Sequence, residues 1–228
     1  MFEAMYKSGW HHPGAAWLVG GLMLLWVVWR LPFFWGYMVG ALALTAVDAG
    51  VTGAWSQAGG EAHVLYTPMT FFFVLFGDWR TYLLAHRYSS APEARPASWW
   101  AGSFAFAFFP MIVIGLMRYI LFVEQFKNMR ILFAVYELIV IGVLTTYLTL
   151  VLPARLARVP AEVARWLRGV VGFGLAHYVL WISSDALIMA GMEWGYGMRM
   201  VPNVMYYALF LPFVYISAPK AIKKDLLS

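Results

Sequence analysis

The chain consists of long apolar runs separated by short polar segments. A helix that crosses a bilayer needs about 20 mostly apolar residues. Seven runs approach this length and are predicted to span: 14–29, 34–55, 64–85, 99–123, 131–152, 169–191 and 201–218. Because only a short turn around Leu31 and Pro32 separates the first two, a six-span arrangement is the alternative. The pattern predicts an all-α, polytopic transmembrane helix bundle of about seven spans, a single membrane domain over residues 1–228.

The composition agrees with a protein whose solvent is lipid. Of the 228 residues, 63% are hydrophobic and 12% are charged, whereas a soluble domain usually carries about 25% charged residues. The 12 Trp and 13 Tyr residues suit the membrane–water interfaces, where an apolar ring and a polar tip are both satisfied. The lipid bilayer is therefore the first predicted partner.

The basic residues give the bundle a direction. Eleven of the 16 Lys and Arg residues fall on one predicted face: Arg30, Arg80, Arg87, Arg95, Arg155, Arg158, Arg165, Arg168, Lys220, Lys223 and Lys224. The positive-inside rule places this face in the cytoplasm, with the N-terminus outside and the C-terminus in the cytoplasm. Since the bases lie in short loops, the net charge of +5 is interpreted as topogenic, and no nucleic acid partner is expected.

The sequence also predicts the structure of three segments that lie outside the spans. Residues 1–13 are predicted to form an unstructured arm, in which the adjacent His11 and His12 do not converge on a metal ion. Residues 89–98, rich in Pro, Ala and Ser, predict a plain linker. In 153–168, apolar residues recur at helical spacing with arginines between them. That pattern favours a basic amphipathic helix on the membrane surface, with a solvated connector as the alternative.

Two stretches of the chain are similar to each other. Asp48 is followed by a Gly-rich turn and Pro68, and Asp185 is followed by a Gly-containing turn and Pro202. The similarity favours two parallel repeats joined by the central span, and a chance match is the alternative. The predicted halves are 14–85 and 131–218, and the joining span is 99–123.

This arrangement of three spans, one span and three spans resembles that of sugar-transporting SWEET proteins, PnuC vitamin permeases and KDEL receptors. The run Val201-Pro202-Asn203 is similar to the Pro-Asn of a SWEET final helix. The Pro-Gln signature of PQ-loop proteins is absent, since Pro153 is followed by Ala154. The resemblance covers a handful of residues, and no family is assigned.

Polar residues inside the predicted spans mark the candidate binding site. An ionisable group in lipid costs roughly 2.5–3.5 kcal/mol and so faces protein or water. The orientation places several of them in the outer half of the bundle, and His177 near the middle of its span: Asp48, Asp185, Glu137, Arg118, Asn203, Thr67 and His177. The prediction is a polar cavity that opens outward and binds a polar solute or cation, or passes protons. Structural pairs between helices, such as Arg118 with Glu137, are the alternative.

Two further features have competing interpretations. Asp78 and Arg80 are placed at the inner end of the third span, as an interfacial pair with Arg80 snorkelling to the headgroups; a gate or a partner contact is the alternative. His177 is interpreted as hydrogen-bonded or cavity-lining rather than as a porphyrin ligand. Neither His63 nor His86 lies at a matching depth to supply a second imidazole.

Several chemistries are excluded by the sequence. Without Cys there is no disulfide, thiolate metal site or Cys nucleophile. Every Lys lies outside the predicted spans, which excludes a retinal Schiff base, and no Walker A motif is present. The methionines near the outer ends of the last two spans are interpreted as packing groups rather than copper ligands. No metal is predicted, and the cofactor is left open.

The preferred function is a small permease or ion-coupled carrier for a polar small solute, which makes an enzyme the less favoured class. The second hypothesis is a non-catalytic subunit of a larger membrane complex that holds pigment, lipid or cofactor. The third is an intramembrane enzyme that modifies a lipid, using His177 and the acids. Association with other membrane subunits or with copies of the same chain is compatible with each.

Overall fold

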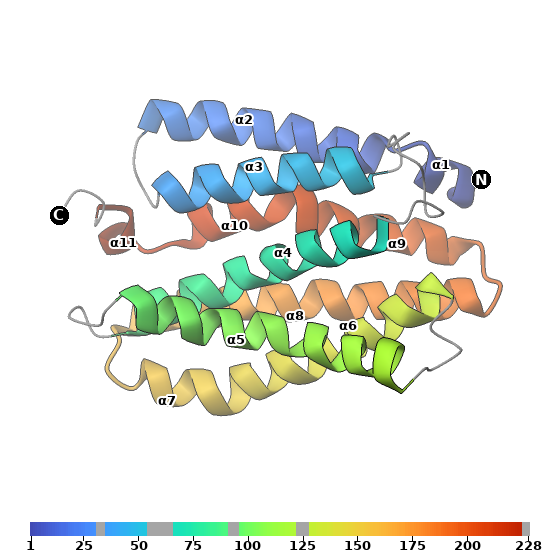
Figure 1. Ribbon diagram of the computed structural model, residues 1–228. Coiled ribbons are helices and arrows are strands. Elements are labelled where there is room, and N and C mark those ends of the chain that lie inside the picture. Colours follow the sequence, from blue (N-terminus) through green and yellow to red (C-terminus); the bar gives the residue numbers. More distant parts are fainter. Residues whose placement is uncertain (31–34, 54–65, 91–95, 122–127, 225–228) are drawn as a thin grey trace. The chain divides into compact units, whose positions relative to one another are not determined.

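A computed structural model of the chain describes residues 1–30, 35–53, 66–90, 96–121 and 128–224 (Figure 1). All regular secondary structure in these residues is helical, so the all-α prediction is confirmed. The helices divide between two compact units, which are described separately below. Unit 1 comprises residues 1–77 and 196–228, and unit 2 comprises residues 78–195.

Among the residues that the structure describes, four helical stretches are long and apolar enough to cross a membrane: Ala97–Ile120, Met129–Leu156, Ala161–Met189 and Trp194–Ser217. They contain 24 to 29 residues, and at a rise of about 1.5 Å per residue each exceeds the bilayer's hydrocarbon core of about 30 Å. The chain therefore has the character of a multi-pass membrane protein. Gly36–Thr52 is apolar but shorter, and the count of seven crossings stays a prediction.

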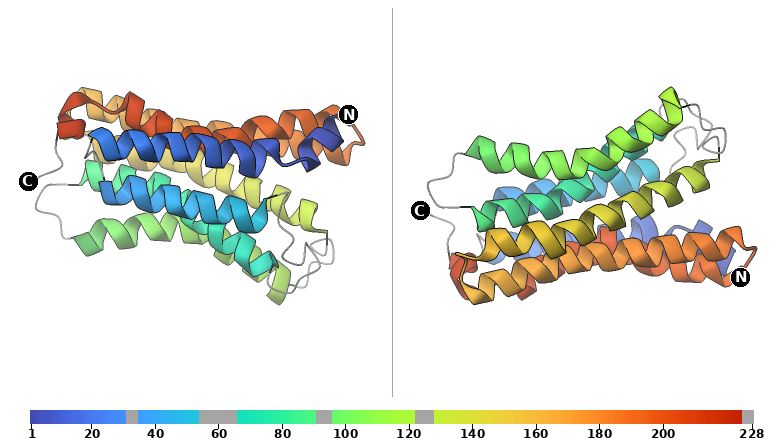
Figure 2. Two further views of the ribbon diagram at one scale, coloured as in Figure 1. Left: turned by 90° about the horizontal axis from the view of Figure 1, so that it is seen from above. Right: turned by 90° about the horizontal axis from the view of Figure 1, so that it is seen from below.

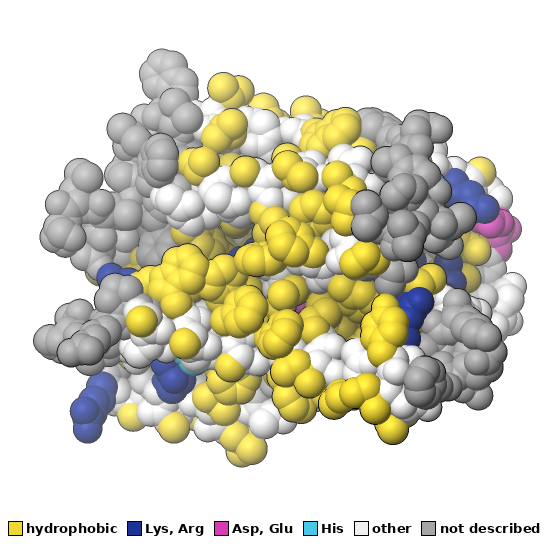
Figure 3. Space-filling model, in the orientation of Figure 1, with side chains coloured by type: hydrophobic (Ala, Val, Ile, Leu, Met, Phe, Trp, Pro, Cys, Tyr) yellow, Lys and Arg dark blue, Asp and Glu magenta, His cyan; other side chains and the backbone are white. Residues whose placement is uncertain are grey.

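Large apolar side chains lie exposed on these and other helices. Leu18, Leu22 and Leu25 share one face near the N-terminal end of the chain and are 60–65% exposed; Leu150 and Ile216 are 70% and 68% exposed. Hydrophobic side chains are widespread over the described surface drawn in Figure 3. Contiguous apolar surface of this kind marks contact with lipid or another protein rather than water.

Unit 1 is built from the two ends of the chain. Its N-terminal elements are α1 (Phe2–Lys7), the wide turn η1 (Trp10–Gly14), α2 (Ala15–Arg30), α3 (Trp35–Thr52) and the first half of α4 (Tyr66–Ser89). Its C-terminal elements are α9 (Trp194–Val204) from residue 196 onward, η6 (Met205–Leu209), α10 (Phe210–Ser217) and α11 (Lys220–Lys224).

Small side chains and indole rings hold the helices of unit 1 together. Ala16 on α2 and Ala49 on α3 are at most 3% exposed. Small side chains of this kind let membrane helices approach each other closely. The Trp17 indole N–H donates to the Ala46 carbonyl at 3.2 Å. Between α2 and α10, the rings of Trp26 and Tyr215 meet edge to face, with their centroids 4.1 Å apart.

The prediction of an unstructured N-terminal arm is wrong. Residues 2–7 form α1, and the following turn buries His11 and His12, which are 1% and 9% exposed. Neighbouring rings explain the burial: His11 packs on Tyr6 at 5.2 Å, and His12 stacks on Tyr207 at 3.8 Å. The sequence shows polar side chains in this segment but not the aromatic surface that receives them.

Unit 2 contains the second half of α4 and the helices that surround it. They are α5 (Pro96–Gly115), η3 (Leu116–Ile120), α6 (Met129–Thr146), η5 (Tyr147–Val151), α7 (Leu152–Leu156) and α8 (Ala161–Met189). Helix α6 packs against both α5 and α8, as Figure 2 shows. From residue 78 to residue 86, nearly every side chain of α4 is buried. Helix α4 can therefore carry polar groups, since protein rather than lipid surrounds it here.

The basic segment 153–168 does not form a separate surface helix, so that prediction is wrong. Its first residues complete α7, and from Ala161 onward it is the start of α8. The helical spacing of its apolar residues is real, but they face the protein: Leu156, Val163 and Leu167 are at most 6% exposed. The periodicity identifies an amphipathic face without identifying the surface on which it packs.

Two wide helical turns have a common cause. Segments η5 and η6 lie just before Pro153 and Pro212. Proline lacks an N–H and its ring clashes with the carbonyl four residues earlier, here those of Thr149 and Ala208, which both lie within the wide turns. Such π-type turns let a long helix continue past the proline.

Candidate functional site

A buried acidic group of unit 2, Asp78, lies at the middle of the 24-residue helix α4. Its side chain is 6% exposed. The Tyr178 hydroxyl on α8 donates to one carboxyl oxygen, Oδ1, and the Tyr136 hydroxyl on α6 donates to the other, Oδ2, both at 2.6 Å. Asp78 thus joins three helices through two hydrogen bonds. We call Asp78, Arg80, Tyr136, His177 and Tyr178 the Asp78 site.

The two bonds have the length of charge-assisted hydrogen bonds from a hydroxyl to a carboxylate, which fall at about 2.5–2.7 Å. An ionised Asp accepts only, so it can hold both tyrosines at once. A protonated Asp carries an O–H donor and keeps fewer acceptor positions. The two hydrogen bonds that join Asp78 to α6 and α8 therefore depend on whether its carboxyl group carries a proton.

Arg80 and His177 complete the site. Arg80 is 5% exposed and interacts electrostatically with both Asp78 and His177. The His177 ring is 3% exposed, its Nδ1 lies 3.3 Å from the Phe173 carbonyl oxygen, and it packs beside Tyr178 at 4.4 Å. The site combines one carboxylate, one guanidinium and one imidazole in a protein interior. Such groups within membrane helices mark proton and ion pathways.

The interpretation of Asp78 and Arg80 as an interfacial pair is wrong. Both side chains are buried, and α4 continues for eleven residues beyond Asp78, to Ser89. Arg80 cannot snorkel to the headgroups, because it packs inside unit 2. It is therefore not a loop charge, and the topogenic argument rests on the remaining bases.

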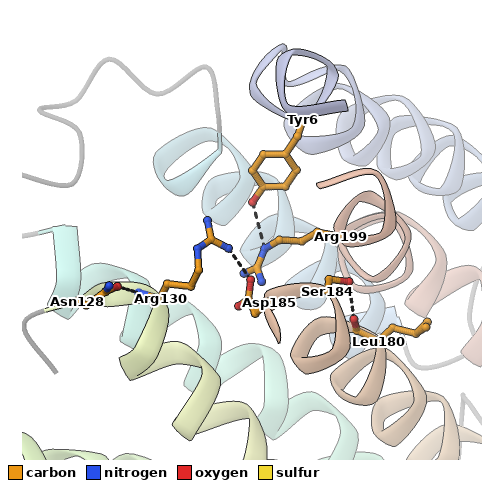
Figure 4. A network of polar contacts seen from close by, with 7 residues as sticks. All are labelled: Tyr6, Asn128, Arg130, Leu180, Ser184, Asp185 and Arg199. Carbon is orange, nitrogen blue, oxygen red and sulfur yellow. Dashed lines mark hydrogen bonds and ion pairs between the residues drawn. The ribbon is translucent and has the colours of Figure 1, made fainter. Parts of the chain in front are cut away.

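A second ionic contact in unit 2 joins α6 to α8 (Figure 4). Arg130 Nη1 lies 2.6 Å from Asp185 Oδ1; the Asp185 side chain is 1% exposed and that of Arg130 is 31% exposed. Asn128 accepts from the backbone N–H of Arg130 and begins α6. The Ser184 hydroxyl donates within its own helix, to the Leu180 carbonyl at 2.6 Å. Asp185 thus anchors the pair of helices.

The other predicted residues of unit 2 have separate surroundings. Glu137 is 3% exposed on α6, where it follows Tyr136 in the sequence. Arg118 is half-buried on η3; its Nη1 lies 3.7 Å from Met129 Sδ and its guanidinium lies over the Tyr119 ring at 5.6 Å. Among the predicted site residues of this unit, His177 therefore belongs to the Asp78 site.

Unit 1 holds Asp48 and Asn203. Asp48 is 3% exposed and accepts the Thr52 hydroxyl at 2.6 Å, and Thr52 also bonds the Tyr207 side chain. Asn203, one helical turn before Tyr207, lies with its Nδ2 3.3 Å from His11 Nε2. The Arg199 guanidinium donates to the Tyr6 hydroxyl at 3.3 Å (Figure 4). Thr67 is in α4, but its side chain lies outside the described residues.

Because His11 and His12 are buried in unit 1, we expect the free energy of unfolding to depend on pH. Burial lowers the pKa of His12 to about 3, with smaller effects from His11 and Arg199. Because the unfolded His12 titrates near 6.5, the unfolded state binds more protons below that pH, and stability falls by up to about 1.4 kcal/mol per pH unit between pH 6 and 4. Thermal unfolding in detergent at successive pH values checks this.

The matched variant for that measurement is His12→Gln, which removes the titrating group. We expect its unfolding temperature to fall less steeply on acidification than that of the wild type. Parallel slopes for the two proteins would show that His12 does not contribute to the pH dependence.

Neither a metal site nor a known relative identifies the function of the described chain. Within the described ranges, no group of three or more His, Asp or Glu side chains lies close enough to hold a metal ion. No family model, curated protein or solved structure matches the chain. The function must therefore be argued from the site itself.

Sequence reasoning missed the tyrosines and the arginine that hold the two carboxylates. Tyr136 and Tyr178 give no signal of their own among 13 tyrosines. The predicted span 131–152 leaves Arg130 in a loop, although an Asn two residues earlier is a recognised start of a helix. That signal places Arg130 in a first helical turn.

Proposed function

We propose that this chain is a proton-coupled membrane carrier for a polar small solute, in which Asp78 binds and releases the proton. The observation that carries the proposal is the buried carboxyl group at the middle of α4, held between Tyr136 and Tyr178. An ionisable residue kept at such depth is costly and is retained where a proton or ion must pass.

The geometry offers a way to couple the proton to a movement of helices. When Asp78 is ionised, its two oxygens accept from α6 and α8 together. When it takes up a proton, the new O–H must be turned toward an acceptor, and one tyrosine bond is lost or reversed. Proton binding thus loosens one of two contacts on α4. A carrier needs such an element with two arrangements in order to open alternately to each side.

Arg80 favours a proton over a metal cation as the coupling ion. Its guanidinium, permanently charged, interacts electrostatically with Asp78 inside the protein. A sodium ion at Asp78 would need several oxygen ligands and would be repelled by this charge at short range. A proton needs only one oxygen and leaves the carboxyl group neutral.

The proposed orientation places the end of unit 2 that carries Ala157 in the cytoplasm. Arg155, Arg158, Arg165 and Arg168 cluster at this end, and the positive-inside rule assigns it to the cytoplasmic side. Ala190 lies at the opposite end of α8. By the same argument the chain's N-terminus is outside and its C-terminus is in the cytoplasm.

Single cysteines test this orientation directly, because the chain has none of its own. Ala190→Cys and Ala157→Cys place thiols at exposed positions after α8 and α7. We expect a membrane-impermeant maleimide to label Ala190→Cys in intact cells, and Ala157→Cys only after permeabilisation. Reversed labelling would invert the orientation, and labelling of both in intact cells would show that α8 does not cross.

Purified protein in liposomes tests the function. The vesicles contain a pH-sensitive dye, and a potassium gradient with valinomycin drives protons inward. Amino acids, sugars, nucleosides and organic cations are added in turn. We expect proton entry faster than in protein-free vesicles, with a rate that one solute class changes. Rates equal to those of protein-free vesicles under every condition contradict the proposal.

A further inference from the structure

A row of buried polar side chains continues from the Asp78 site toward the end of α4. Asp78, Tyr82 and His86 are spaced four residues apart and so share one face of the helix. Tyr147 on η5 joins them: its ring lies 5.1 Å from that of Tyr82 and is stacked on His86 at 5.8 Å. We call Tyr82, Tyr147 and His86 the polar row.

The three side chains of the polar row are enclosed by protein. Tyr147, Tyr82 and His86 are 0%, 1% and 2% exposed. Phe106 on α5 contacts all three rings at 4.9–5.8 Å. Gly102 lets the imidazole lie directly on α5, since a Cβ there would come within 2.9 Å of His86 Nδ1. The row therefore lies between α4, α5 and η5, away from lipid.

The polar atoms of this row have unmet hydrogen-bonding capacity. Among the described residues, no partner is found for the Tyr82 hydroxyl, the Tyr147 hydroxyl or either ring nitrogen of His86. Folded proteins satisfy at least about 90% of buried polar side-chain atoms, and water is the usual partner where protein atoms are not. Four such atoms on three touching side chains point to a shared set of partners.

Water fits this row better than an organic solute does. Rings whose centroids are about 5–6 Å apart pack against one another, and no bulky molecule enters between them. A water molecule needs only about 15 Å³ and typically makes about three hydrogen bonds. Two hydroxyls and an imidazole supply both donors and acceptors for it.

The two ends of the row give it a direction. At one end, Tyr82 interacts electrostatically with Asp78. At the other, Arg155 interacts with both His86 and Tyr147, and its Nε donates to the Ser89 hydroxyl at 3.0 Å, where α4 ends. Arg155 and Ser89 are half-buried. The row therefore leads from the middle of α4 to the boundary of the packed interior of unit 2.

We infer that the polar row binds a chain of ordered water molecules that carries protons between Asp78 and the Ser89–Arg155 end of unit 2. The inference rests on the proposed function and adds the proton's route. A proton arriving at the Arg155 end forms a bond to one water oxygen, and that oxygen releases another proton to its neighbour. His86 takes up a proton at one ring nitrogen and releases one from the other. Each proton that enters delivers one proton to the Asp78 carboxylate.

Hydroxyl-radical footprinting of the full chain in lipid nanodiscs tests the water directly, without an activity assay. Radicals formed from ordered internal water modify adjacent side chains even when these are buried. We expect labelling of Tyr82, Tyr147 and His86 well above that of Phe210, an aromatic residue of unit 1 that is 1% exposed. Labelling of all three no faster than that of Phe210 would overturn the inference.

Three variants test the route in the liposome assay. Tyr147→Phe and Tyr82→Phe each remove one oxygen, and His86→Phe removes both nitrogens. We expect each to slow voltage-driven proton entry at least about tenfold, a barrier increase of about 1.4 kcal/mol. Tyr88→Phe, on the same helix and packed on Trp166 at 5.2 Å, is the matched control and keeps the wild-type rate.

The outcomes separate the two proposals. If Asp78→Asn leaves proton entry unchanged, the proposed function fails. If Asp78→Asn abolishes proton entry while the three variants of the polar row keep the wild-type rate, the route fails and the proposed function stands. Should His86→Phe fail to fold, the two Tyr→Phe variants, each lacking a single oxygen atom, carry the test.

Discussion

Replacing Asp78 with Asn is expected to abolish proton-coupled transport while leaving the protein folded. The amide keeps the size of the side chain and can still accept the Tyr178 or Tyr136 hydroxyl, but it binds no proton at any pH of interest. Proton entry into dye-loaded liposomes should fall to the rate of protein-free vesicles. Asn at position 78 cannot pick up the proton at all, so no slower proton transfer through this site remains. We therefore expect the loss of proton-coupled transport to be complete.

The matched control is Glu162→Gln, which makes the same chemical change at an exposed position in the first turn of α8. It should transport at the wild-type rate. Tyr136→Phe and Tyr178→Phe each remove one of the two hydrogen bonds to Asp78, and we expect intermediate rates. Wild-type transport by Asp78→Asn would show that the proton binds elsewhere.

Removing Arg130 is expected to give the largest loss of stability. Its partner Asp185 is 1% exposed, so Arg130→Met leaves a buried carboxylate without its counter-ion. Breaking a buried pair in this way typically costs about 3–5 kcal/mol; since Arg130 itself is 31% exposed, we expect a value near 3 kcal/mol. Unfolding by SDS in mixed micelles measures the change in free energy.

A double-mutant cycle separates the ion pair from simple loss of packing. Arg130→Met with Asp185→Leu replaces both charges, and a buried pair exchanged for apolar groups is often neutral. We therefore expect the double variant to regain most of the stability lost by Arg130→Met. Arg118→Met, at a half-buried base that contacts Met129 and Tyr119, should cost less than about 1 kcal/mol. Additive effects of the two single changes would contradict the ion pair.

The apolar runs of the sequence locate the helices well, because a long apolar run has few alternatives to a helix in lipid. The predicted run 131–152 falls within α6 to α7, and 169–191 overlaps α8, which begins eight residues earlier, at Ala161, and ends at Met189. The same method places helix ends poorly where charges occur inside a buried helix. The predicted span 64–85 has Asp78 and Arg80 at its inner end, but in α4, which runs from Tyr66 to Ser89, both side chains are buried.

That error displaced the candidate site. Interpreted as an interfacial charge, Asp78 belongs to a membrane surface; in the structure it lies buried at the middle of α4. Hydropathy sums report the average character of a segment, and they do not report that α5, α6 and α8 cover α4 on its sides. The partners Tyr136 and Tyr178 are 58 and 100 residues away, a separation that no local pattern encodes.

The most direct test of the account is the protonation of Asp78 itself. Infrared difference spectra between acidic and alkaline buffer, recorded on lipid-reconstituted protein with isotope-labelled aspartate, report each Asp carboxyl group that changes protonation. We predict a carboxylic acid band in the wild type and in Glu162→Gln that is missing from Asp78→Asn. Identical spectra for the wild type and Asp78→Asn would show that Asp78 neither gains nor loses a proton, and would contradict the account.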